Sequence, residues 1–367
     1  MKRTTLPASL LFFLLAAVPS SSWAESIDTA TPPAQKPSPG DSVASDDGAR
    51  TDDSVWMIST RHLGCPCGDK QAEPDFRWLR YDCGSGWQET NWSDWSAAEL
   101  PGTTTVVYVH GNRVEGGEAG RRGLAAYRAL IRNASDSRPI RFVVWSWPSD
   151  KVMGPHPKRD VQVKAARTPC QSFYLACFLS RLNPDTQLSL LGYSFGARIV
   201  SGALHLANGG ALGSLQLSEP CPRAPHSVRV AVFAAAMNND WWLPDHCHGQ
   251  TWSAVDRLCL LYNSCDPVLR FYPRLDRRRR PQALGYTGFC WAASLGDEAW
   301  RLEQTNVCCA IGKTHDEFAY FASNAIMCRV SETLLALEAA RSGQIAGGGH
   351  NSYIALQSSS LPASQQD

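Results

Sequence analysis

A serine between two glycines gives the clearest chemical signal in the sequence. Within the stretch Leu188–Ala197, an apolar run leads into Gly192, and Ser194 follows two residues later. Gly196 then comes before a pattern with helical spacing. A serine at the apex of a sharp strand-to-helix turn exposes its hydroxyl at the carboxyl edge of a sheet, and the small neighbours let strand and helix approach. The pattern predicts that Ser194 is a nucleophile; a turn serine in a glycine-rich loop is the alternative.

An acid and a base follow this serine along the chain. Asp266 comes after the apolar run Leu258–Asn263, and Pro267 biases it to an extended conformation where the strand breaks off. His315 lies after that run and before an apolar helical stretch. A histidine oriented by an acid can activate a serine for acyl transfer. The sequence predicts Asp266 as the acid and His315 as the base, with Asp240 as the alternative acid.

Five short apolar runs provide the elements that would position these residues. Each is almost continuously hydrophobic, as expected for strands of a parallel sheet with helices on both faces. A helical pattern between the third and fourth runs adds strand–helix alternation, which is typical of a doubly wound sheet. Two upstream segments, 55–62 and 76–81, are expected as antiparallel edge strands. The five runs are Thr104–His110, Arg141–Trp147, Leu188–Gly192, Val228–Ala235 and Leu258–Asn263.

The order of these features resembles the α/β-hydrolase superfamily, in particular its poorly characterised exported bacterial serine hydrolases. The resemblance covers residues 103–322 and rests on four segments in the expected order. It implies an α/β-hydrolase fold, with a mostly parallel doubly wound sheet and helices on both faces. A disulfide-rich N-terminal extension is expected in addition from the cysteines before residue 103, and it departs from the better-known branches of the superfamily. The order serine, acid, histidine is the one that this fold uses. The four segments are Val106–Arg113, the Ser194 turn, Leu258–Pro267 and Gly312–Glu317.

The resemblance also implies how the transition state would be stabilised. The backbone N–H of Phe195 and one from the loop after His110 would hold the oxyanion. In that loop Asn112 is the expected donor and Arg113 the alternative. His110 itself is expected to brace the loop. The predicted site therefore consists of a catalytic triad and two oxyanion donors.

Both ends of the chain lack the features of a folded domain. Residues 1–24 have a basic start, the apolar run Leu6–Val18 and a small-x-small motif ending at Ala24, as in a signal peptide. That run is shorter than the ~20 residues that cross a bilayer, and no later stretch is long and apolar enough. Residues 25–54, rich in proline and acidic residues, and the Gly- and Ser/Gln-rich residues 341–367 are expected to be disordered.

The part between these ends is expected to form one large domain. Residues 55–102 are a cysteine- and tryptophan-rich extension, and residues 103–340 are the catalytic domain. The tryptophans of the extension are expected to pack against its disulfides rather than to bind a sugar. The mature chain is then exported to the periplasm, the medium or the cell surface, with no transmembrane span.

The thirteen cysteines agree with export. All of them come after residue 24, and disulfides persist in oxidising compartments. An odd number leaves at least one without a partner in the chain. The pairs of cysteines that lie closest in the sequence lack the spacing of zinc ligands, so several structural disulfides are expected and no metal site. The alternative is a metal site at Asp245, His246 and His248. The closest pairs are Cys65 with Cys67 and Cys308 with Cys309.

Charge and motifs together define the expected function. With 35 Lys+Arg and 34 Asp+Glu, the chain lacks the excess of positive charge that is typical of nucleic-acid-binding proteins. We expect an exported serine hydrolase, carboxylesterase- or lipase-like, that cleaves an ester or thioester of a small-molecule or lipid-like acyl substrate without a cofactor. An acyltransferase with the same triad and a non-catalytic binding protein with this fold are the alternatives. The acyl specificity, the oligomeric state and the role of Arg277–Arg280 are left open.

Overall fold

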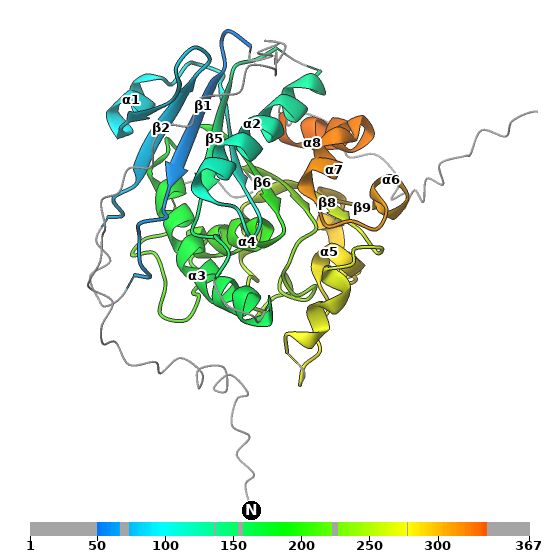
Figure 1. Cartoon of the computed structure of the whole chain (residues 1–367). Coiled ribbons are helices and arrows are strands. Elements are labelled where there is room, and N and C mark those ends of the chain that lie inside the picture. Colours follow the sequence, from blue (N-terminus) through cyan, green and yellow to red (C-terminus); the bar gives the residue numbers. More distant parts are fainter. Residues whose placement is uncertain are drawn as a thin grey trace, which may run out of the picture. The chain divides into compact units, whose positions relative to one another are not determined.

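A nine-stranded sheet runs through the part of the chain that the computed structural model describes (Figure 1). The described residues are 50–66, 73–135, 137–152, 157–221, 227–276 and 278–335. The predicted signal peptide, most of the predicted linker and the predicted tail lie outside them. The strand order is β3-β2-β1-β5-β4-β6-β7-β8-β9. The strands are β1 (Ser54–Ser59), β2 (Arg77–Asp82), β3 (Gly86–Thr90), β4 (Thr104–Val109), β5 (Ile140–Ser146), β6 (Gln187–Tyr193), β7 (Val228–Phe233), β8 (Val255–Tyr262) and β9 (Leu302–Asn306).

Most of the sheet is parallel, as the sequence predicted. In the spatial order β1-β5-β4-β6-β7-β8-β9 each strand pairs in parallel with the next. Beside β1, β2 and β3 add an antiparallel hairpin at one edge. The expectation of an antiparallel edge strand at 55–62 is wrong, because β1 pairs in parallel with β5 and lies inside the sheet. Val55–Ile58 are buried without interruption, which suits an inner strand covered on both sides.

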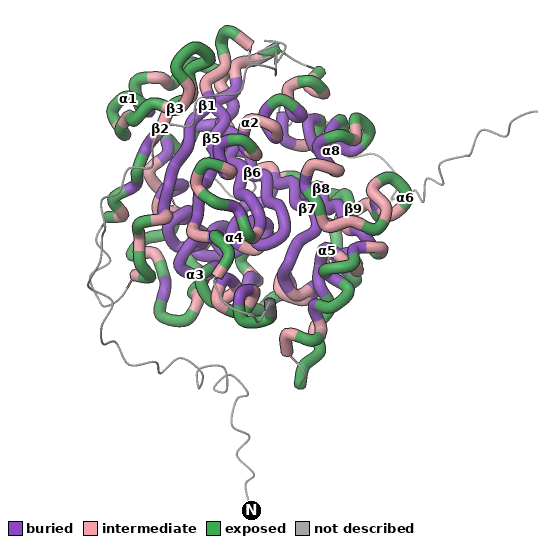
Figure 2. The backbone as a smooth tube through the Cα atoms, in the orientation of Figure 1, coloured by how far each residue is buried: buried purple, intermediate pink, exposed green. Residues whose placement is uncertain are grey.

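Helices cover both faces of the sheet, which confirms the predicted α/β class. On one face α2 (Gly116–Arg132), α7 (Glu317–Ala322) and α8 (Asn324–Leu335) pack on one another, and on the other face α3 (Pro157–Arg181) packs on α4 (Phe195–Ala207) (Figure 1). Figure 2 shows the central strands buried between them. In the described part of the chain, no helix is both long and apolar enough to cross a membrane. The shorter helices are α1 (Trp92–Ala97), η1 (Thr251–Ser253), η2 (Leu269–Arg274), α5 (Leu284–Thr287), η3 (Ala292–Arg301) and α6 (Cys308–Ile311).

The N-terminal extension continues the same sheet and the same core. Trp95 of α1 is almost fully buried, and its ring centroid lies 5.9 Å from that of Phe178 in α3. A disulfide between Cys65 and Cys170 also joins the extension to α3. Asp53, just before β1, accepts hydrogen bonds from the Tyr127 hydroxyl and from a backbone N–H of β5. The aromatic side chains of the extension therefore serve packing.

Two disulfides form among the described residues, Cys65–Cys170 and Cys265–Cys308, each with a Cα–Cα distance of 5.4 Å. They confirm that disulfides are present, but neither joins cysteines that are neighbours in the sequence. Seven other cysteines in the described ranges are thiols spread over separate elements, so within these ranges fewer bridges form than the composition suggested. These thiols are Cys83, Cys177, Cys247, Cys259, Cys290, Cys309 and Cys328.

Candidate active site

Ser194 occupies the sharp turn between β6 and α4. Its backbone angles, φ 53° and ψ −115°, lie where a non-glycine residue is uncommon. Two backbone hydrogen bonds hold the turn: the Ser194 N–H donates to Phe233 O at 3.1 Å, and the Ala236 N–H donates to Ser194 O at 3.1 Å. Strain of this kind persists only where the surroundings fix it, and it concentrates at functional sites.

The two glycines of the turn leave room that no other residue would leave. A Cβ on Gly192 would lie 2.6 Å from Ala197 Cα, and one on Gly196 would lie 1.9 Å from Val109 O. Both obstacles are backbone atoms, which cannot rotate away. The close packing of β6, α4 and β4 around Ser194 therefore requires glycine at both positions.

His315 and Asp266 meet Ser194 at the carboxyl edge of the sheet. Ser194 Oγ lies 3.1 Å from His315 Nε2, and His315 Nδ1 lies 2.6 Å from Asp266 Oδ2. The Asp266 carboxylate is fully buried, and its Oδ1 accepts the backbone N–H groups of Val268 at 2.8 Å and Leu269 at 2.9 Å. These two bonds fix the carboxylate, so Oδ2 faces the imidazole.

The alternative acid lies elsewhere. Asp240 Oδ2 is 3.4 Å from His246 Nδ1, and Asp266 is the carboxylate at His315. The structure thus brings together the three residues that the sequence predicted for the triad. With Nδ1 donating to Asp266, Nε2 can accept the Ser194 hydroxyl proton.

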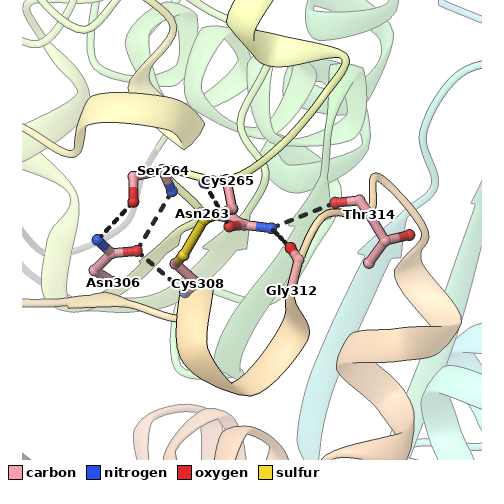
Figure 3. The surroundings of a disulfide bond; sticks show 7 residues. All are labelled: Asn263, Ser264, Cys265, Asn306, Cys308, Gly312 and Thr314. Carbon is pink, nitrogen blue, oxygen red and sulfur yellow. Dashed lines mark hydrogen bonds between the residues drawn. A yellow bond between two sulfur atoms is a disulfide. The ribbon is translucent and has the colours of Figure 1, made fainter.

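A covalent and polar clamp holds the acid loop against the histidine loop (Figure 3). The disulfide joins Cys265, next to Asp266, to Cys308 at the start of the segment that leads to His315. Asn263 Nδ2 donates to the backbone carbonyls of Gly312 at 2.9 Å and Thr314 at 3.3 Å. Asn263 Oδ1 accepts the Cys265 N–H at 2.9 Å. Sequence reasoning missed Asn263, although a polar residue at the end of an apolar strand run was a signal.

Glu317 fixes the histidine loop from its other side. Its carboxylate is fully buried, accepts the Tyr108 hydroxyl at 2.6 Å and pairs with Arg122 of α2. Burial raises the pKa of Glu317, while the hydrogen bonds from Tyr108 and Arg122 oppose that shift. His315 therefore lies between two anchored segments. Sequence reasoning did not single out Glu317; an acid two residues from the base was the available signal.

The loop after β4 packs directly against the nucleophile turn. A Cβ on Gly111 would lie 2.7 Å from a Tyr193 ring carbon and 3.2 Å from Ser194 Cβ. The Arg113 N–H is already engaged, donating to Ser149 O at 2.8 Å. Among the described residues, the backbone N–H of Asn112 has no partner. On the other side of Ser194, Phe195 is the first residue of α4, where N–H groups have no intrahelical acceptor.

His110 braces this loop. Its ring is fully buried, with Nδ1 2.9 Å from Gly111 O, and its backbone carbonyl accepts the Trp147 indole N–H at 2.9 Å. Burial lowers the pKa of His110 to about 3. The imidazole is therefore neutral at physiological pH and serves as a fixed support.

The other candidate residues lie in separate environments. His248 is buried, with Nδ1 2.8 Å from Ser201 Oγ, whereas His246 faces Asp240. Within the described ranges, no three His, Cys, Asp or Glu side chains are grouped as metal ligands would be. In the arginine run, the backbone N–H groups of Arg278 and Arg279 donate to Asp276 in an exposed turn, and residue 277 is outside the described residues.

Comparisons with known proteins identify no family. No protein-family model matches the chain, and no curated protein matches it. Among solved structures, the chain is similar to Zea mays acyl-protein thioesterase 2, with 16% sequence identity and a TM-score of 0.34 over 64% of this chain and 94% of that one. The functional assignment therefore depends on the geometry of the site itself.

Proposed function

We propose that the protein is a serine hydrolase that cleaves a carboxylic ester or thioester through an acyl-enzyme. The hydrogen-bonded chain from Ser194 Oγ through His315 to the buried Asp266 carboxylate carries this proposal. Nucleophile, base and orienting acid in this order form the arrangement that activates a serine for acyl transfer.

The proposed reaction has two halves. Ser194 Oγ attacks the acyl carbonyl while His315 Nε2 takes its proton, and Asp266 stabilises the imidazolium. The N–H groups of Phe195 and Asn112 would hold the oxyanion, and one such donor is typically worth about 10²–10³ in kcat. His315 then gives the proton to the leaving alcohol or thiol, and a water activated by the same imidazole releases the acid from Ser194.

A fluorophosphonate probe tests the proposal, together with hydrolysis of 4-nitrophenyl esters and of an acyl thioester. We expect labelling and hydrolysis by the wild type and neither by Ser194→Ala with an unchanged circular dichroism spectrum. Labelling that persists in Ser194→Ala would refute this nucleophile. A folded wild-type protein that neither labels nor hydrolyses would indicate a binding protein, and faster product formation with an added alcohol would indicate an acyltransferase.

We also propose that the protein functions outside the cytoplasm. The basic and apolar N-terminal residues with a small-x-small site, and two disulfides in the described residues, support this location. The mature protein should begin at Glu25, which N-terminal sequencing of material from fractionated cells would show. Full-length protein in the cytoplasmic fraction would contradict the proposal.

A further inference from the structure

One face of α4 carries a cation a single turn beyond the nucleophile. α4 begins at Phe195, directly after Ser194, and Arg198 is its fourth residue, so Arg198 lies in the first turn of the helix. Helical side chains lean toward the helix N-terminus, which directs Arg198 back toward the Ser194 end. The Arg198 guanidinium carbon lies 4.6 Å from the centre of the Trp241 ring, a cation–π distance.

The loops around Arg198 are those that build the catalytic site. Trp241 belongs to the segment after β7, whose Ala236 N–H holds the Ser194 carbonyl. Tyr272, which influences Arg198 electrostatically, belongs to η2, the short helix that follows Asp266. α4 begins directly after β6 at the edge of the sheet that carries Ser194, so Arg198 in its first turn lies near that edge.

Arg198 differs from the other enclosed arginines because no acid neutralises it. Arg122 pairs with Glu317 and Arg141 with Glu99, whereas within the described ranges Arg198 makes no ion pair and no hydrogen bond. Asp240, on the same loop as Trp241, faces His246 instead. An enclosed charge usually has a partner, because its burial costs free energy.

The charge of Arg198 is not balanced by its polar neighbours either. Burial lowers the pKa of Arg198, and the two groups that oppose this shift are Tyr272 and Cys247. Burial raises the pKa of Tyr272 to about 12 and raises that of Cys247, so both are neutral at pH 7. Arg198 as a residue is half-buried, so part of its surface stays accessible.

We propose that Arg198, stacked on Trp241, is an anion-binding subsite and that the substrate is an ester or thioester that carries a carboxylate. The inference rests on the proposed hydrolase function and names its substrate class. A stacked guanidinium keeps its N–H edge free, and that edge matches a carboxylate in two parallel hydrogen bonds. One guanidinium balances one negative charge, which favours a carboxylate over a phosphate dianion.

Matched pairs of esters test this subsite. In the acyl arm, mono(4-nitrophenyl) adipate is compared with 4-nitrophenyl hexanoate, and in the alcohol arm 5-acetoxy-2-nitrobenzoate is compared with 4-nitrophenyl acetate. We expect the wild type to prefer the anionic ester in one arm, which identifies the half of the substrate that carries the charge. Arg198→Gln should lower the anionic-to-neutral ratio of kcat/KM in that arm by about 10- to 100-fold, as for loss of a charge-assisted hydrogen bond.

Arg257→Gln is the matched control, because Arg257 lies over Trp300 at the same 4.6 Å but near the start of β8, at the opposite edge of the sheet. It should leave the ratio unchanged. Equal ratios in both arms for wild type and Arg198→Gln would overturn the subsite while the hydrolase proposal stands.

A binding measurement separates the two proposals. Calorimetry on Ser194→Ala should show monomethyl adipate binding more tightly than neutral dimethyl adipate, and an added Arg198→Gln should remove the difference. If wild type hydrolyses nothing but this difference is found, the hydrolase proposal fails and the subsite stands. If neither monomethyl adipate nor 5-acetoxy-2-nitrobenzoate binds Ser194→Ala more tightly than its neutral counterpart, dimethyl adipate or 4-nitrophenyl acetate, the subsite is overturned.

Discussion

Removing the disulfide that clamps the acid loop to the histidine loop should lower kcat by more than the accompanying loss of stability explains. The change is Cys265→Ser with Cys308→Ser, both together so that the neighbouring thiol of Cys309 cannot pair with a remaining Cys265. The Cys65–Cys170 bridge, which joins the extension to α3, provides a matched control as Cys65→Ser with Cys170→Ser.

Loss of the two bridges should affect stability and activity in opposite order. Loop-closure entropy gives about 4 kcal/mol for the bridge across 43 residues and about 4.8 kcal/mol for the one across 105 residues. The control should therefore lose at least as much stability as the clamp variant. Only the clamp variant frees the segment between Cys308 and His315, and a displacement of about 1 Å at a catalytic group can cost about 10²-fold in rate.

Urea unfolding and ester kinetics, measured on both double variants below their unfolding transitions, check this prediction. We expect kcat to fall about 10- to 100-fold in the clamp variant, with a smaller change in KM, and to stay within about twofold of wild type in the control. Treatment of wild type with dithiothreitol, which reduces both bridges, should lower kcat by about the same factor as in the clamp variant. Retention of kcat in the clamp variant, or equal losses in both, would refute the role assigned to this bridge.

Three further changes have defined outcomes. Asp266→Asn should keep the fold and KM but lose about 10⁴-fold in kcat, because the imidazole loses its tautomer control; steady-state kinetics check this, and a loss below tenfold would contradict it. Gly196→Ala should lower the free energy of unfolding by about 1–3 kcal/mol, because its Cβ meets a backbone carbonyl of β4. Gly117→Ala, whose Cβ has nothing within 4 Å, should not lower it. The midpoints of urea unfolding of the two variants check this, and equal midpoints would contradict it. Burial lowers the pKa of His110 to about 3, so below pH 6.5 the unfolded chain binds a proton that the folded protein does not. Stability is therefore lost as the pH falls from 6.5, and between pH 6.5 and 4 this loss should be smaller in His110→Asn. The measurement is the free energy of unfolding from urea titrations at each pH. The same dependence of this free energy on pH in wild type and variant would contradict the assignment.

The sequence by itself determined the features that depend on neighbouring residues. The serine turn follows from a strand, two glycines and a helix within ten residues, and the glycine requirement is a local steric fact. Continuous apolar runs likewise predicted the buried parallel strands, because a strand covered on both faces has no polar side. The expected direction of 55–62 was wrong because strand pairing depends on partners far away in the chain, here β5.

Only the tertiary structure decided which distant residues meet. Asp240 and Asp266 both follow apolar strands, so their sequence contexts are similar, and the fold alone places Asp266 at His315. The same holds for the pairing of Cys265 with Cys308, and for Arg198, whose lack of an acidic partner no local pattern reveals. Such contacts depend on the order of strands in the sheet and on the paths of the loops between them, which the packing of the whole chain sets.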